Sequence, residues 1–154
     1  MLEKLLGLLV GKIPEVDAND EEALRIAVAA LLIEAGRMDQ RFEDRERQAI
    51  RGLLSERFAL EGAELDRVFY EAEQRVQGSD QYYPFTSIIC RRMDGPQRAQ
   101  IIEMLWRVVY ADGVLDAYED ALIRQVAALI QVDDRERAKA RQRALAALGI
   151  EGRN

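Results

Sequence analysis

The order of a helix, an acidic turn and a second helix occurs twice in this chain, at residues 110–119 and earlier at residues 38–46. Apolar residues at three- and four-residue steps flank both turns, as in amphipathic helices. The turns share acidic and apolar positions in these pairs: Asp39 with Asp112, Phe42 with Leu115, Glu43 with Asp116, and Glu46 with Glu119. The repetition predicts two related helix-turn-helix units, residues 19–58 and 94–130.

Helix start and stop signals divide the rest of the chain. Asn19, Asp94 and Asp133 are expected N-caps, because each precedes a Glu or Gln by three residues. Gly113 and Gly149 are expected to end helices, because glycine readily adopts the left-handed conformation. Together these signals predict helices over residues 1–10, 19–38, 43–58, 61–76, 81–93, 97–111, 116–130 and 133–148.

Composition favours an all-α fold. Alanine, leucine, glutamate and arginine dominate, the 154 residues include only three prolines, and no stretch alternates apolar and polar β-branched residues. We expect a compact helical bundle of about 7–8 helices in a single domain, residues 1–154. Residues 19–132 are expected to form its core, residues 1–18 a short helix and connector, and residues 133–149 a C-terminal helix.

Charge and residue content argue against several classes of function. The net charge of −6 disfavours a nucleic-acid partner, because phosphate binding needs a basic face. The chain has no histidine, which excludes imidazole as a base or metal ligand. Its single cysteine rules out an internal disulfide and is compatible with a reducing compartment. Residues 1–12 are too short to cross a membrane, so a helix docked on the core is expected there, with weak membrane contact as the alternative.

Residues 108–119, Val-Val-Tyr-Ala-Asp-Gly-Val-Leu-Asp-Ala-Tyr-Glu, resemble the signature of the TerB-like (tellurite-resistance) family. Residues 29–46 are similar to the same family's earlier helix pair, and the resemblance extends over residues 21–132. The resemblance implies an all-helical domain with internal pseudo-symmetry and a cytoplasmic role in stress or metal response. It also implies an acidic surface that binds divalent ions.

The first acidic turn departs from the second. Gln40 stands where the second turn has Gly113, and arginines surround the carboxylates of the first turn. We expect Arg41, Arg45 and Arg47 to neutralise these carboxylates through local ion pairs. A metal role is therefore weaker for the first turn than for the second.

The two acidic turns form the candidate binding site. Asp112, Asp116 and Glu119 offer oxygen ligands from one short segment, and Asp39 and Glu46 are the candidates to join them from the first turn. Oxygen ligands without histidine favour Ca²⁺ or Mg²⁺ over Zn²⁺. Under the alternative interpretation these residues only cap helices, since Asp116 and Glu119 have the spacing of a capping box.

No catalytic constellation accompanies these turns. Cys90 lies in an apolar run with no histidine to activate it, and we expect it in the core together with Trp106, Tyr110 and Tyr118. The sequence predicts a non-enzymatic stress-response module that acts through an unknown protein partner and binds a divalent cation at the acidic turns. The alternatives are a metal-dependent or otherwise uncharacterised enzyme, and a structural protein–protein adaptor without metal.

Overall fold

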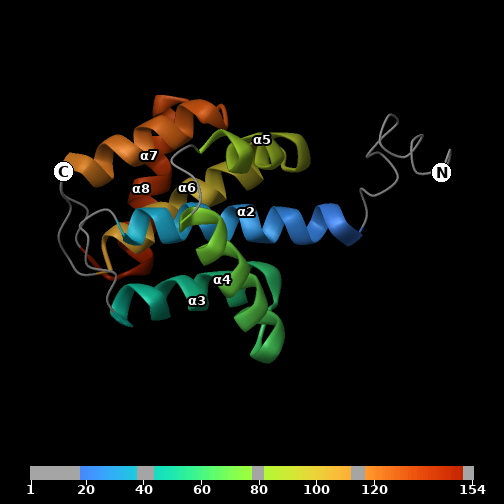
Figure 1. The fold of residues 1–154 in the computed structure, drawn as a ribbon. Helices are drawn as coiled ribbons and strands as arrows, with labels where there is room; N and C mark the ends of the chain where they lie inside the picture. The colour runs from blue at the N-terminus through green and yellow to red at the C-terminus, as the bar shows by residue number, and fades with distance from the viewer. Residues whose placement is uncertain (1–17, 38–43, 78–81, 112–116, 151–154) are drawn as a thin grey trace, which may run out of the picture.

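The computed structural model describes residues 18–37, 44–77, 82–111 and 117–150. Helices account for most of these residues and no strand occurs within the four ranges, so the predicted all-α bundle is confirmed. The helix predicted over residues 1–10 lies outside them. The helices drawn in Figure 1 are α2 (Ala18–Gly36), α3 (Asp44–Phe58), α4 (Gly62–Gln77), α5 (Tyr83–Arg92), α6 (Gly95–Val109), α7 (Ala117–Leu129) and α8 (Asp134–Ala147).

Helix α2 forms the centre of the bundle. Every residue from Ile26 to Ile33 is buried, so this stretch is apolar on all sides. A helix of this kind must be surrounded by other elements. Helix α2 indeed contacts α3, α4, α5, α6 and α7, and Figure 1 shows it running through the middle of the bundle.

Helix α8 packs chiefly against α6. It buries Ala140, Ala144 and Leu145, and the short alanine side chains allow the two helices to approach closely. At the edge of this contact, Arg143 Nε donates a hydrogen bond of 2.9 Å to Glu103 Oε1. The last helix is therefore attached to the bundle mainly through α6.

Two of the predicted N-caps are confirmed. Asp94 Oδ1 accepts a hydrogen bond from the Gln97 N–H at 2.9 Å, and Gln97 Oε1 accepts one from the Asp94 N–H at 2.9 Å. This reciprocal pair is a complete capping box at the start of α6. Asp133 Oδ1 accepts from the Glu136 N–H at 2.8 Å and caps α8.

The prediction that Asn19 caps α2 is wrong. Helix α2 begins at Ala18, which places Asn19 inside the first turn. Glu22, the predicted capping partner, forms an ion pair with Arg67 of α4. Carboxylates anywhere in the first turn are favoured by the helix dipole, so the acidic residues that follow Asn19 mark the start of the helix only approximately.

Several helices end on a residue in the left-handed conformation. Gly149 follows α8 with φ +73°, as predicted. The corresponding residues after α3 and α7 are Ala59 (φ +56°) and Gln131 (φ +62°), where the sequence gives no such signal. A residue with a Cβ is disfavoured by about 1–2 kcal/mol in this region, so both positions hold local strain.

The predicted burial of the aromatic residues holds only in part. Trp106 is 2% exposed and Tyr110 packs against the core, but Tyr118 is 71% exposed, so its predicted place in the core is wrong. Tyr118 is the second residue of α7, and in this first turn the buried side chain is Glu119. The neighbouring helices decide which face of the first turn packs against the core. The local sequence does not specify these contacts.

The chain order of α2–α3 and α6–α7 follows the two predicted helix-turn-helix units. Their superposition as structural repeats stays a prediction.

None of the described helices is long and apolar enough to cross a membrane.

Candidate functional site

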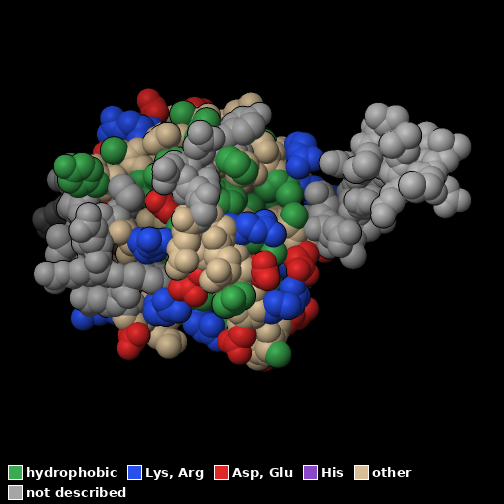
Figure 2. All heavy atoms as spheres, viewed as in Figure 1, with side chains coloured by type: hydrophobic (Ala, Val, Ile, Leu, Met, Phe, Trp, Pro, Cys, Tyr) green, Lys and Arg blue, Asp and Glu red, His purple; other side chains and the backbone are tan. Residues whose placement is uncertain are grey.

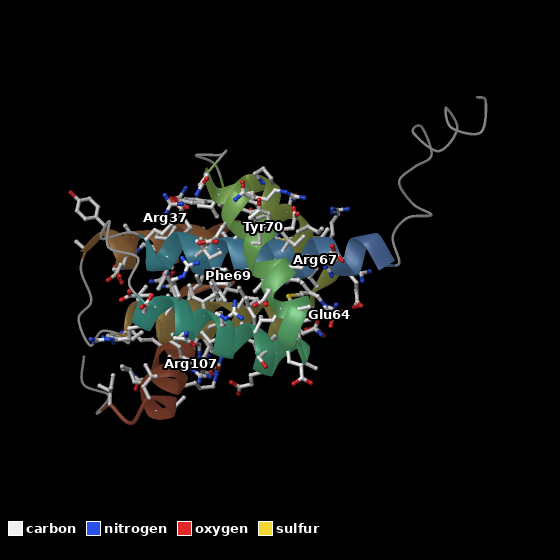
Figure 3. The ribbon with its side chains drawn as sticks, turned by 60° about the horizontal axis from the view of Figure 1, so that its bottom comes forward. Arg37, Glu64, Arg67, Phe69, Tyr70 and Arg107 are labelled. Carbon is white, nitrogen blue, oxygen red and sulfur yellow. The ribbon has the colours of Figure 1, made fainter. Side chains whose placement is uncertain are left out.

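The four helix ends that flank the two acidic turns lie on the same side of the bundle. Figures 1 and 3 show the C-terminal ends of α2 and α6 and the N-terminal ends of α3 and α7 at the left of the molecule. Figure 3 is turned about the horizontal axis, so left and right are the same in both views. The N-terminal ends of α3 and α7 carry partial positive charge, which favours the carboxylates of their first turns. The C-terminal ends of α2 and α6 carry partial negative charge, which favours a cation.

Glu46 and Glu119 occupy matching positions at this end, since each is the third residue of its helix. Their exposed fractions are 5% and 6%, which makes them the buried acidic residues of the described ranges. Buried carboxylates normally have partners, and each of these two makes polar interactions in the structure. The structure therefore buries one predicted metal ligand of each turn.

The other candidate ligands, Asp39, Asp112 and Asp116, lie outside the described residues. Within the described ranges, no three Asp, Glu, His or Cys side chains are grouped so that they could hold a metal ion. Glu46 and Glu119 are thus the described members of the candidate site. A complete ligand set would need carboxylates from the turns themselves.

Arg47 reaches across to α4, and its expected ion pair with the carboxylates of the first turn stays a prediction. Its Nη1 donates to Glu73 Oε2 at 2.9 Å, and its guanidinium carbon lies 5.0 Å from the centre of the Phe69 ring. Arg51 pairs with a carboxylate of α4 and lies 5.6 Å from the same ring. Figure 3 labels Phe69, and Figure 2 shows acidic and basic side chains interspersed over this face. These arginines attach α3 to α4.

Tyr110 lies between α6 and the second acidic turn, and the sequence did not reveal how it is held. Its ring stacks on Trp106 with 5.9 Å between ring centres, and its hydroxyl accepts a hydrogen bond of 2.9 Å from Arg141 Nε. The Arg141 guanidinium carbon lies 5.6 Å from the Trp106 ring and 5.7 Å from the Tyr110 ring. The four-residue spacing of the aromatics is a signal for their stacking, but nothing in it identifies the arginine of α8.

Cys90 of α5 and Tyr82, the residue just before α5, belong to a different part of the bundle. Cys90 is partly buried against the core, and its thiol donates to the Leu129 carbonyl oxygen at 3.4 Å. Burial, followed by the nearby Glu34 carboxylate, raises the pKa of Tyr82. Both observations follow from the packing of α5 on the core.

Comparison with known proteins identifies the family of the chain. Residues 25–142 match the family model TerB, described as tellurite resistance protein TerB. Neither a search of curated proteins nor a search of solved structures gave a match. The family match includes both acidic turns and covers most of the chain. This chain therefore belongs to the TerB family of tellurite resistance proteins.

Proposed function

We propose that this chain is a non-enzymatic binding module of the tellurite-resistance response, and that it holds Ca²⁺ or Mg²⁺ at the end of the bundle where α3 and α7 begin. The observation that carries the proposal is the burial of Glu46 and Glu119 at matching positions of two helix starts on one side of the molecule. The proposed ligand set adds Asp39, Asp112 and Asp116 from the two turns.

The chemistry of this end favours a hard cation. Buried carboxylates are found with partners that balance their charge, and a bound cation can be one of them. Ca²⁺ takes about six to eight oxygen ligands and Mg²⁺ about six, more than Glu46 and Glu119 supply, so the turn carboxylates and backbone carbonyls would complete the set. The net charge of −6 also attracts cations to the protein.

A binding role fits the residue content better than catalysis does. The chain contains no histidine, so a metal-dependent enzyme built on these turns would lack the commonest base. The partner of such a module is proposed to be another protein, since the negative charge disfavours nucleic acid.

Thermal unfolding tests the cation site. The melting temperature of the full chain is measured with millimolar Ca²⁺, with millimolar Mg²⁺ and with chelator, at constant ionic strength. Cation binding to the folded state raises the melting temperature by mass action. We expect Glu119→Gln and Asp112→Asn to lose most of this shift.

Glu64→Gln is the matched control, because Glu64 is an exposed glutamate in the first turn of α4. This variant makes the same change in charge at a helix start without a buried carboxylate, and should keep the full shift. A wild type that melts at the same temperature with cation and with chelator would refute the site. So would an equal loss of the shift in Glu64→Gln and Glu119→Gln.

A further inference from the structure

A pocket of about 360 Å³ opens between α3 and α6. Leu53 and Met104 supply apolar lining, and Arg57 of α3 and Arg107 of α6 bring two guanidinium groups to the pocket. Figure 3 labels Arg107 between α3 and α8. Arg57 follows Glu46 by about three helical turns, and Arg107 lies in the last turn of α6, so the arginine pocket uses other residues than the proposed cation site.

The two arginines have hydrogen-bonding capacity that the described residues do not use. The Nε–H groups of Arg57 and Arg107 are buried and have no hydrogen-bond acceptor within the described ranges. Arg107 Nη1 lies 3.9 Å from Glu56 Oε1, which is too far for a hydrogen bond. The Arg57 guanidinium carbon lies 5.2 Å from the centre of the Phe58 ring. The buried Nε–H groups are closed to solvent and therefore to a ligand. A ligand in the pocket would meet the terminal Nη groups of the two guanidinium groups, which are the charge-assisted donors that remain.

Glu56 and Glu103 also line the pocket, but neither carboxylate neutralises both arginines. Glu103 Oε1 already accepts a hydrogen bond of 2.9 Å from Arg143 Nε, so its charge is balanced. The Glu56 side chain is 69% exposed, which leaves it free to turn into solvent. Arg57 has no ion pair within the described residues, and a ligand would compete with Glu56 for the long ion pair of Arg107.

We propose that the arginine pocket binds a small, doubly charged oxyanion of the size of inorganic phosphate. Guanidinium groups donate parallel hydrogen bonds that match the oxygens of phosphate-like anions. With Glu103 paired to Arg143 and Glu56 turned into solvent, two guanidinium groups balance two negative charges. A volume of about 360 Å³ admits such an ion with some of its water. The proposal goes beyond the cation site and uses none of its residues.

Isothermal titration calorimetry of the full chain with inorganic phosphate at pH 8, with chloride as the reference at equal ionic strength, tests the proposal. We expect phosphate to bind and the Nε–H nuclear magnetic resonance signals of Arg57 and Arg107 to shift. Arg107→Gln should weaken binding by about tenfold or more, because it removes a charge-assisted hydrogen bond. Glu56→Gln should strengthen binding, because it removes a negative charge from the pocket.

Arg124→Gln provides the control, since Arg124 lies on α7 and pairs with Asp120 at 2.9 Å. It makes the same change in net charge and should bind phosphate as the wild type does. If Arg107→Gln fails to fold, two other variants still test the proposal. Arg57→Gln should weaken phosphate binding, and Glu56→Gln should strengthen it. The proposal is overturned if phosphate gives no more heat than chloride, if Arg124→Gln and Arg107→Gln weaken binding equally, or if Glu56→Gln leaves the affinity unchanged.

Discussion

The contact of Arg141 with Trp106 and Tyr110 can be measured by a double-mutant cycle. Tyr110→Phe removes the hydroxyl that accepts the 2.9 Å hydrogen bond from Arg141 Nε, but keeps the ring that stacks on Trp106. Arg141→Met removes the charge and the donors, but keeps an unbranched apolar side chain. The cycle therefore isolates the hydrogen bond from the packing around it.

The expected magnitudes follow from the geometry. A hydrogen bond to a charged donor contributes about 1.5–3 kcal/mol, and both side chains are partly exposed, so we expect a coupling free energy of about 1 kcal/mol. Arg141→Met also loses the cation–π contacts at 5.6 Å and 5.7 Å. At about 0.5–1 kcal/mol for each contact, the single variant should lose about 2–3 kcal/mol of unfolding free energy in total.

Urea unfolding followed by tryptophan fluorescence provides the assay. Trp106 is the only tryptophan of the chain and is 2% exposed, so its emission reports the loss of this packing. Arg124→Met, on the exposed face of α7, should change the unfolding free energy by less than about 0.5 kcal/mol. If the effects of Tyr110→Phe and Arg141→Met are additive within about 0.3 kcal/mol, the hydrogen bond contributes nothing and the reasoning fails.

Three further measurements test the fold. Gln131→Gly should raise the unfolding free energy by about 0.5–1 kcal/mol, because it relieves a left-handed residue at φ +62°; a lower value in urea unfolding would contradict this reasoning. Leu32→Ala, at a fully buried position of α2, should lower it by about 2.7–5 kcal/mol in the same assay, and a loss below about 1 kcal/mol would refute tight packing there. Because burial and Glu34 raise the pKa of Tyr82 in the folded state, the stabilisation present below the ordinary pKa of about 10 should be lost as pH rises towards the folded value. Tyr82→Phe should flatten this part of the stability–pH curve, and identical curves for the two proteins would exclude the effect.

Local chemistry made much of the fold predictable. The N-caps Asp94 and Asp133 depend on residues within three positions of each, and both were predicted correctly. Asn19 failed because several residues near it favour a helix start, and the pattern does not decide which comes first. The left-handed conformation of Gln131 has no local signal, because the structure imposes it on a residue that does not prefer it.

The candidate site was predictable in position but not in environment. The repeated pattern placed Glu46 and Glu119 in the first turns of two helices, as the structure does. Their burial depends on which face of each first turn packs, and that is decided by helices distant in sequence. The same limit applies to Arg141, whose partners Trp106 and Tyr110 become neighbours only when α8 crosses α6.

The central place of α2 has a consequence for synthesis of the chain. Helix α2 is made before α6 and α7, which follow it by many residues and which it contacts. Until those helices have left the ribosome, the apolar stretch from Ile26 to Ile33 lacks part of its covering. Long-range contacts of this kind also slow folding, because a large loop must close before they form. A nascent chain that ends before α6 is therefore expected to expose an aggregation-prone helix, and the core can be completed only after α6 and α7 have been made.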